Sequence, residues 1–125
     1  MPRFDPTATP DNKLLAALPH YEYQRLAPHL KPIKLPFGEV LYEVGDTVHR
    51  VYFVTSGLLS LVLTDNTGHD VEVGLAAHEG VGGFNAILTG EPSKFRTIVQ
   101  GEGTALAAPI DVVREEFKHA RHTYH

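Results

Sequence analysis

Histidine is the residue type in this chain to test first for metal or acid–base chemistry. The eight histidines are His20, His29, His49, His69, His78, His119, His122 and His125. His119 and His122 lie within one turn of a predicted C-terminal helix, and such a pair can bind zinc weakly. A metal site usually needs three or four ligands with supporting hydrogen bonds. We therefore interpret the pair as exposed polar helix residues and predict no metal site.

Nucleophilic catalysis has no better candidate. The chain has no Cys, and Ser56 lies between Thr55 and Gly57 in a predicted turn without an identifiable base. No Gly-x-Ser-x-Gly elbow, phosphate-binding P-loop or zinc-protease motif occurs. We predict no catalytic residue and no enzyme activity. A small cupin-like metalloenzyme is the alternative favoured least, because the His-x-His spacing of cupins is absent.

The charge distribution argues against nucleic acid as a partner. The 11 Lys and Arg residues and the 15 Asp and Glu residues give a net charge of −4, whereas nucleic-acid-binding domains carry a basic surface. Between Val51 and Ser93 there is no Lys or Arg, but there are five carboxylates. An anion bound there would depend on Arg96, Lys94 and backbone amides.

The elements that must position any site are short strands. All 11 glycines lie between Gly38 and Gly103, and seven of the nine prolines lie at or before Pro36. Glycine marks turns and bulges, and proline marks breaks and helix starts. Seven or eight short strands at regular spacing predict a β-sandwich or roll. The expected strands cover 30–35, 40–42, 48–54, 58–63, 69–75, 95–100 and 104–107.

Helical patterns are confined to the flanks and to one internal turn. Asp11 or Asn12 can cap a first short helix, and Pro19 begins a second one that stops before Pro28. Residues 84–88 predict one or two helical turns after the glycine-rich loop 79–84. At 125 residues the chain has the length of one domain. We expect an irregular segment over 1–10 and a single domain over 11–125, without a secretory signal or membrane span.

Two ordered glycine motifs identify a resemblance to a known family. Gly38-Glu39-Val40-Leu41-Tyr42-Glu43-Val44-Gly45 and Tyr52-Phe53-Val54-Thr55-Ser56-Gly57 resemble the cyclic-nucleotide-binding, or effector, domain of Crp/Fnr-type bacterial transcription regulators. The resemblance covers about residues 12–121. It implies a mainly β fold, an antiparallel eight-stranded, jelly-roll-like β-roll with short flanking helices. It also implies a cytoplasmic sensor that ends before the family's dimerisation helix and helix-turn-helix.

The resemblance further implies where an effector binds. In this family a glycine loop and the short helix after it present N–H groups to a cyclic phosphate, while a Glu accepts the ribose hydroxyl and an Arg pairs with the phosphate. The candidate ligand-binding residues are Gly80, Gly82, Gly83, Phe84, Asn85, Arg96, Thr97 and Ile98. The implied effector is a cyclic nucleotide or another small anionic ligand. The alternative is that the glycine loop is only a tight turn.

The phosphate-binding segment departs from the family pattern. Phe84, or Gly83 under a one-residue shift, stands where the family has Glu. Arg96 matches the family's Arg, with Lys94 as a competing match, and Ile98 replaces a small Ala. An unmet ribose or phosphate group loses about 1–3 kcal/mol. We therefore expect weak or absent binding of cyclic AMP.

An apolar stripe in the C-terminal helix raises the question of whether the chain pairs with a second copy. Ile110, Val113, Phe117, Ala120 and Tyr124 form a stripe at helical spacing. We favour packing of this stripe against the roll, with a weak homodimer as the alternative. We expect no DNA binding by this chain alone. A stand-alone small-ligand-binding or protein-interaction domain is the other functional interpretation.

Overall fold

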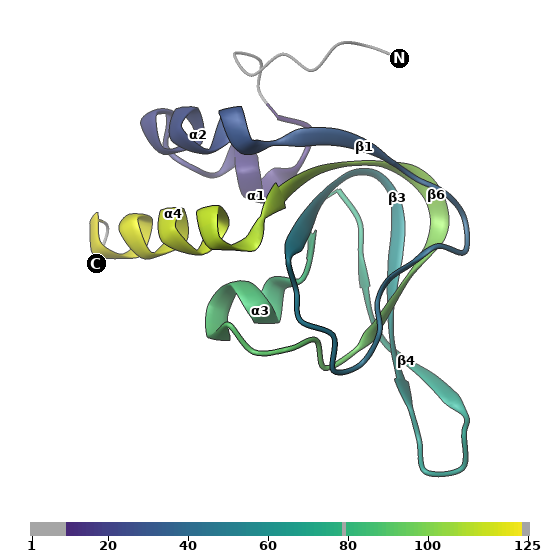
Figure 1. Cartoon of the computed structure of the whole chain (residues 1–125). Coiled ribbons are helices and arrows are strands. Elements are labelled where there is room, and N and C mark those ends of the chain that lie inside the picture. The colour runs from purple at the N-terminus through teal and green to yellow at the C-terminus, as the bar shows by residue number, and fades with distance from the viewer. Residues whose placement is uncertain (1–9, 79, 124–125) are drawn as a thin grey trace.

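The computed structural model describes the backbone of residues 10–78 and 80–123 and the side chains of 10–78 and 80–118. Short helices flank a set of antiparallel strands (Figure 1). The helices are α1 (Lys13–Ala16), α2 (His20–Leu26), the 3-10 helix η1 (Ala27–His29), α3 (Phe84–Thr89) and α4 (Ile110–Thr123). The strands are β1 (Lys31–Leu35), β2 (Val40–Tyr42), β3 (Arg50–Thr64), β4 (Asp70–Ala76), β5 (Val81–Gly82) and β6 (Arg96–Pro109).

The strands form one six-stranded sheet with the order β1-β6-β3-β4, in which β2 also pairs with β6 and β5 with β3. Every pairing is antiparallel. The sheet curls into an open roll, and the β3–β4 hairpin projects from it (Figure 1). Pro32 lies on β1, an edge strand, where a missing N–H is tolerated. The predicted mainly β, antiparallel fold is confirmed.

The seven expected strand segments form five strands, because two expected turns are bulges inside continuous strands, and the short β5 within the expected glycine loop is the sixth. Residues 48–54 and 58–63 join through Gly57 into β3, and 95–100 and 104–107 join into β6. The register between β3 and β6 shifts at Ser56 and Leu58, where Gly57 has φ +88°. An extra residue in one strand bends the ladder without ending it. These bends curl the sheet into the roll.

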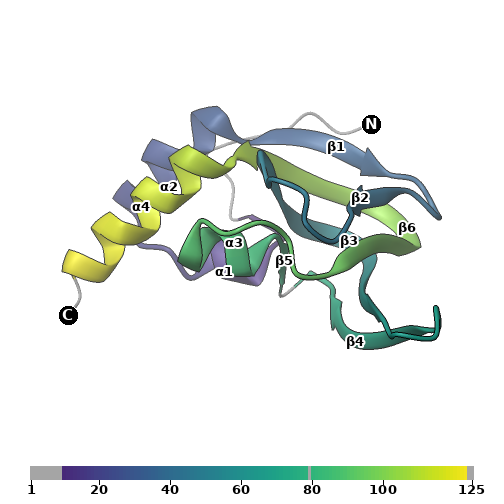
Figure 2. The same ribbon diagram turned by 60° about the horizontal axis from the view of Figure 1, so that its bottom comes forward.

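The core lies between the curled sheet and the helices at one end of it (Figure 2). β3 and β6 contribute most of it, because both run through the centre of the sheet and bury residues on both faces. Phe53, Val54, Leu59 and Val99 are fully buried there. At about 25 cal/mol per Å² of apolar area, burial of such side chains is the main force that stabilises the fold.

The N-terminal helices begin where the sequence predicts. The Asn12 side chain caps α1 by accepting hydrogen bonds from the N–H groups of Leu14 (3.0 Å) and Leu15 (3.2 Å). Pro19 precedes α2, whose buried face includes Tyr23 and Leu26. Proline suits a helix start because its φ is fixed near the helical value.

α4 packs on the roll through part of the predicted stripe. Val113 is fully buried, and Ile110 and Phe117 pack against the core. The rest of the stripe, Ala120 and Tyr124, lies outside the side chains that the structure describes. The Arg25 guanidinium pairs with Glu116 at 3.2 Å and joins α2 to α4. Among the described helices, none has the length and apolar character that a membrane crossing requires.

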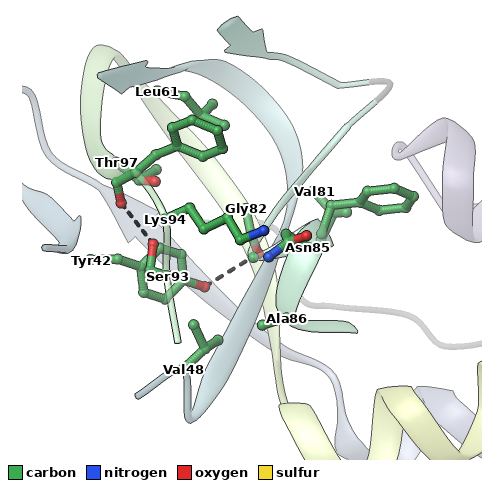
Figure 3. A pocket seen from close by; sticks show the side chains of 13 residues that line it. Tyr42, Val48, Leu61, Val81, Gly82, Asn85, Ala86, Ser93, Lys94 and Thr97 are labelled. Atoms are coloured by element: carbon green, nitrogen blue, oxygen red, sulfur yellow. Dashed lines mark hydrogen bonds between the residues drawn. The ribbon is translucent and has the colours of Figure 1, made fainter. Parts of the chain in front are cut away.

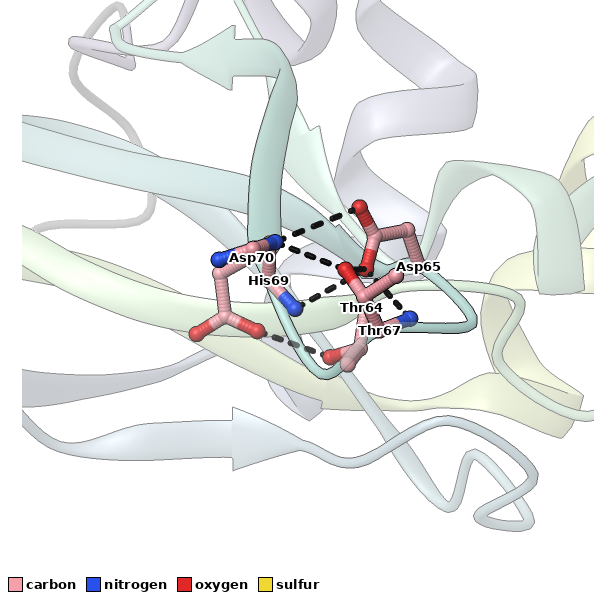
Figure 4. A network of polar contacts seen from close by, with 5 residues as sticks. All are labelled: Thr64, Asp65, Thr67, His69 and Asp70. Atoms are coloured by element: carbon pink, nitrogen blue, oxygen red, sulfur yellow. Dashed lines mark hydrogen bonds and ion pairs between the residues drawn. The ribbon is translucent and has the colours of Figure 1, made fainter.

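A polar network holds the turn of the β3–β4 hairpin (Figure 4). The Asp65 carboxylate accepts hydrogen bonds from the Thr67 N–H (2.9 Å), the Thr67 hydroxyl (2.7 Å) and the His69 N–H (2.9 Å). These hydrogen bonds hold the pKa of Asp65 below its ordinary value of 3.8, and the bond from the Thr67 hydroxyl contributes most. The turn lies between the expected strands 58–63 and 69–75, and Gly68 within it has φ +86°.

Candidate functional site

A cavity of about 180 Å³ lies inside the roll, between the sheet, the loop before α3 and the segment before β6 (Figure 3). The residues that line it are Tyr42, Val48, Leu61, Val81, Gly82, Gly83, Phe84, Asn85, Ala86, Ser93, Lys94, Phe95 and Thr97. The two segments that the sequence singled out therefore face each other across one space.

The structure brings five of the eight candidate residues to this cavity. Gly82, Gly83, Phe84, Asn85 and Thr97 line it. The other three do not line it, and each has a different environment.

Arg96 lies on the opposite face of β6 from the cavity. Successive side chains of a strand point to opposite faces, so Thr97 faces the cavity while its neighbours Arg96 and Ile98 face away. The Arg96 Nε atom lies 2.9 Å from Glu43 Oε1, an ion pair without the alignment of a hydrogen bond. Its Nη1 atom lies 3.9 Å from Asp70 Oδ2.

Gly80 lies at the base of the loop, against the N-terminal helix. Its carbonyl accepts hydrogen bonds from the Asn12 side-chain nitrogen (2.7 Å) and from the Val54 N–H (3.3 Å). Its N–H donates to the Ala77 carbonyl at 2.8 Å. Both backbone groups of Gly80 are thus used inside the protein.

The two lining glycines are packed against the protein itself. A Cβ at Gly83 would lie 2.9 Å from the Tyr42 hydroxyl and 3.0 Å from Val51 Cγ1, and the φ of Gly83 is +94°. A Cβ at Gly82 would lie 3.0 Å from Leu59 Cδ1. Backbone conformation and close packing both require glycine here, apart from any ligand.

Tyr42 forms the floor beneath these glycines. Its hydroxyl donates to the carbonyl oxygens of Arg50 and, at 3.2 Å, Gly82. Burial raises the pKa of the Tyr42 phenol, and the neighbouring Tyr52 adds to the rise. Tyr42 therefore stays a neutral hydrogen-bond donor that fixes the cavity wall.

Charge is scarce around the cavity. Among the described residues that line it, none is Asp or Glu, and Lys94 is the one cation. The Lys94 side chain is 59% exposed, and its Nζ atom lies 3.7 Å from Glu91 Oε2. The ammonium is thus solvated at the rim, where an ion pair contributes little.

Sequence reasoning did not select most of the apolar lining. Tyr42, Leu61, Val81, Ala86 and Phe95 belong to elements far apart in the chain, and only the curl of the sheet gathers them. One signal was available in the sequence: alternation along the expected strand 95–100 places Phe95 and Thr97 on one face and Arg96 on the other. Lys94, the competing match for the family's Arg, does line the cavity.

No group of three or more His, Cys, Asp or Glu side chains with metal-site geometry occurs among the described residues. His125 lies outside these residues, as do the side chains of His119 and His122.

Comparison with known proteins gives one family and many structures of the same fold. The sequence profile described as "Cyclic nucleotide-binding domain" matches residues 32–120. No curated protein matches the sequence. The N-terminal domain of a transcriptional regulator from Streptomyces coelicolor is 22% identical with a TM-score of 0.70, over 89% of this chain and 77% of that one.

Two protein kinase A regulatory subunits, both called cAMP-independent, are also similar. A mutant of the Trypanosoma brucei subunit bound to cAMP is 16% identical with a TM-score of 0.72, over 94% of this chain and 45% of that one. The Trypanosoma cruzi subunit bound to guanosine is 17% identical with a TM-score of 0.72, over 89% of this chain and 38% of that one. This chain spans less than half the length of either subunit, and the likeness shows the fold.

Proposed function

The chain belongs to the family of cyclic nucleotide-binding domains, and from this membership we propose that it is the effector-sensing domain of a Crp/Fnr-type transcription regulator whose cavity binds cyclic AMP weakly or not at all. Likeness to the N-terminal domain of the Streptomyces transcriptional regulator, over most of both chains, supports a place in a transcription regulator. A cytoplasmic, bacterial setting belongs to the same proposal.

The position of Arg96 is the observation that carries the proposed weak binding. A cyclic phosphate in the cavity needs a cation that faces it, because burial of an unpaired charge is costly. Arg96 faces away and pairs with Glu43 and Asp70 instead. To reach the cavity it would have to leave both carboxylates and cross the strand.

The missing ribose acceptor supports the same conclusion. Phe84, which stands where the family has Glu, lines the cavity with an apolar ring that is 47% exposed. Each ribose hydroxyl or phosphate oxygen left without a partner loses about 1–3 kcal/mol. Two such losses, about 2–6 kcal/mol together, lower the affinity by roughly one and a half to four orders of magnitude.

Calorimetric titration of the chain with cyclic AMP and cyclic GMP tests the proposal. We expect no saturable heat at micromolar ligand, and micromolar affinity for either nucleotide would overturn the weak-binding proposal. The double variant Phe84→Glu/Lys94→Arg restores both family groups at exposed positions of the rim and should strengthen cyclic AMP binding at least about tenfold. The matched control Phe37→Glu/Lys34→Arg places the same groups away from the cavity and should leave binding unchanged.

The chain by itself is proposed not to bind DNA. Its net charge of −4 offers phosphates little attraction. A gel shift at low salt should show no specific complex, and sedimentation should show at most a weak dimer through α4.

A further inference from the structure

The cavity inside the roll differs in chemistry from a phosphate site, and this difference indicates what it holds. We infer that it takes a small uncharged aromatic ligand bearing an amide-like hydrogen-bonding group. This inference rests on the proposed sensing function, because it assigns the chemical class of the effector. It is argued from the size, the walls, the polar groups and the charge of the cavity.

The size favours a ring compound. An apolar cavity of roughly 150 Å³ is large enough to bind benzene, and this one measures about 180 Å³. One aromatic ring with a small substituent therefore fills it. A complete nucleotide, with a base, a ribose and a phosphate, would extend beyond the walls.

The walls favour an aromatic ring. Tyr42, Phe84 and Phe95 contribute rings from three separate segments, and Val48, Leu61, Val81 and Ala86 contribute aliphatic surface. Aromatic pairs prefer offset-stacked or edge-to-face arrangements, which favour a planar ligand over a flexible chain of equal area.

Two polar side chains give the ligand an orientation. The Nδ2 atom of Asn85 is buried and has no hydrogen-bond partner among the described residues. The side chain of Thr97, a residue only 3% exposed, lines the same cavity. A buried donor without a partner is unfavourable, and a ligand carbonyl in the cavity would satisfy it. An amide also has N–H groups, so it can bond to Asn85 or Thr97 as donor or acceptor.

The charge balance excludes an anionic group in the interior. Lys94, the one cation of the lining, is largely solvated and paired with Glu91, while Arg96 lies across the strand. A carboxylate or phosphate would lose its hydration without gaining a buried cation. A neutral amide has no such loss.

Benzamide and benzoate provide the test, because they have nearly the same shape and differ in charge. Amide chemical-shift titrations of the ¹⁵N-labelled chain should show saturable shifts for benzamide at Asn85, Ala86 and Thr97. Benzoate should bind at least about tenfold more weakly. Equal or tighter binding of benzoate would overturn the inference, and so would the absence of benzamide shifts up to its solubility limit.

Variants locate the site. Asn85→Leu removes the amide and should weaken benzamide binding roughly tenfold, whereas Ala86→Leu fills the cavity and should abolish it. Leu88→Ala, on the exposed side of α3, is the control that should bind normally. If Ala86→Leu lowers the melting temperature substantially, its loss of binding is not informative, and the affinity of Asn85→Leu for benzamide decides whether the site is located correctly. Unchanged affinity in Asn85→Leu would contradict the assigned polar contact.

The result can be separated from that of the proposed function. Failure of benzamide together with absent cyclic AMP binding overturns only the ligand class. Micromolar binding of cyclic AMP, with or without benzamide, overturns the weak-binding proposal itself.

Discussion

The side-chain nitrogen of Asn12 donates a 2.7 Å hydrogen bond to the carbonyl oxygen of Gly80, at the base of the loop that leads into the cavity wall. The same nitrogen donates to the Val54 carbonyl at 2.8 Å. Asn12 is fully buried, and its oxygen caps α1. One side chain thus joins the N-terminal helix, the central strand and the glycine loop.

Replacement of Asn12 tests this junction. Asn12→Ala removes a helix cap, worth about 1 kcal/mol, and two further buried hydrogen bonds, to the carbonyls of Val54 and Gly80, worth about 1 kcal/mol each. We expect the free energy of unfolding in urea to fall by about 2–4 kcal/mol. Asn12→Asp is the informative comparison, because it keeps the cap but loses both donations and buries a charge. Wild-type stability in Asn12→Asp would show that the two donated bonds contribute little.

Alanine variants of Gly83 and Gly68 distinguish the energetic cost of backbone strain from the cost of a steric clash. Both have a left-handed φ, +94° and +86°, in which an L residue costs about 1–2 kcal/mol. A Cβ at Gly68 meets open space, whereas one at Gly83 meets Tyr42 and Val51. Gly83→Ala should therefore lower the free energy of unfolding by about 1–3 kcal/mol more than Gly68→Ala. Equal losses in the two variants would mean that the loop moves away from Tyr42 without cost.

Glu22 is a buried carboxyl group on α2. It is fully buried, and neither of its carboxylate oxygens has a hydrogen-bond partner among the described residues. A buried polar group without a partner costs about 1–3 kcal/mol. Glu22→Met, of similar size and apolar, should raise the free energy of unfolding by that amount. Gln24→Met, at an exposed position of the same helix, should change it by less than about 0.5 kcal/mol. A less stable Glu22→Met chain would point to a partner for the carboxyl group.

Acid should loosen the β3–β4 hairpin turn through Asp65. Its pKa is held below 3.8 by hydrogen bonds that only the folded turn provides. A lowered pKa in the folded state stabilises the turn above pH 3.8, and this contribution is lost as the pH falls through the lowered pKa. Amide shifts of Thr67 and His69 should therefore titrate with a midpoint below 3.8.

Asp65→Asn serves as the control for that titration. It should abolish the acidic transition at Thr67 and leave the rest of the fold unchanged. A midpoint at or above 3.8 in the wild-type chain would contradict the contribution of the turn bonds.

Much of the fold could be predicted from local patterns. Asn12 caps α1, Pro19 precedes α2, Gly68 lies in the hairpin turn and a short helix follows the glycine loop. These features depend on neighbours in the chain, whose chemistry is visible in the sequence. The strand count was less accurate, because a glycine in a turn and a glycine in a bulge have the same local signature. Gly57 belongs to a bulge only because β6 pairs with β3 on both sides of it.

The candidate site likewise has features that could be predicted from the sequence and features that only the tertiary structure shows. The sequence predicted that a glycine loop and a strand near Arg96 lie close together, and it determined that the stretch from Val51 to Ser93 has no Lys or Arg. Tertiary structure decided which face of β6 each side chain occupies, and so directed Arg96 to Glu43 and Asp70 and Thr97 to the cavity. Tertiary structure also brought the aromatic side chains of Tyr42, Phe84 and Phe95, from separate segments, together around the cavity. The physical reason is that side-chain direction follows from strand pairing and sheet curl, which join residues far apart in the chain, whereas residue type and local conformation are set by near neighbours.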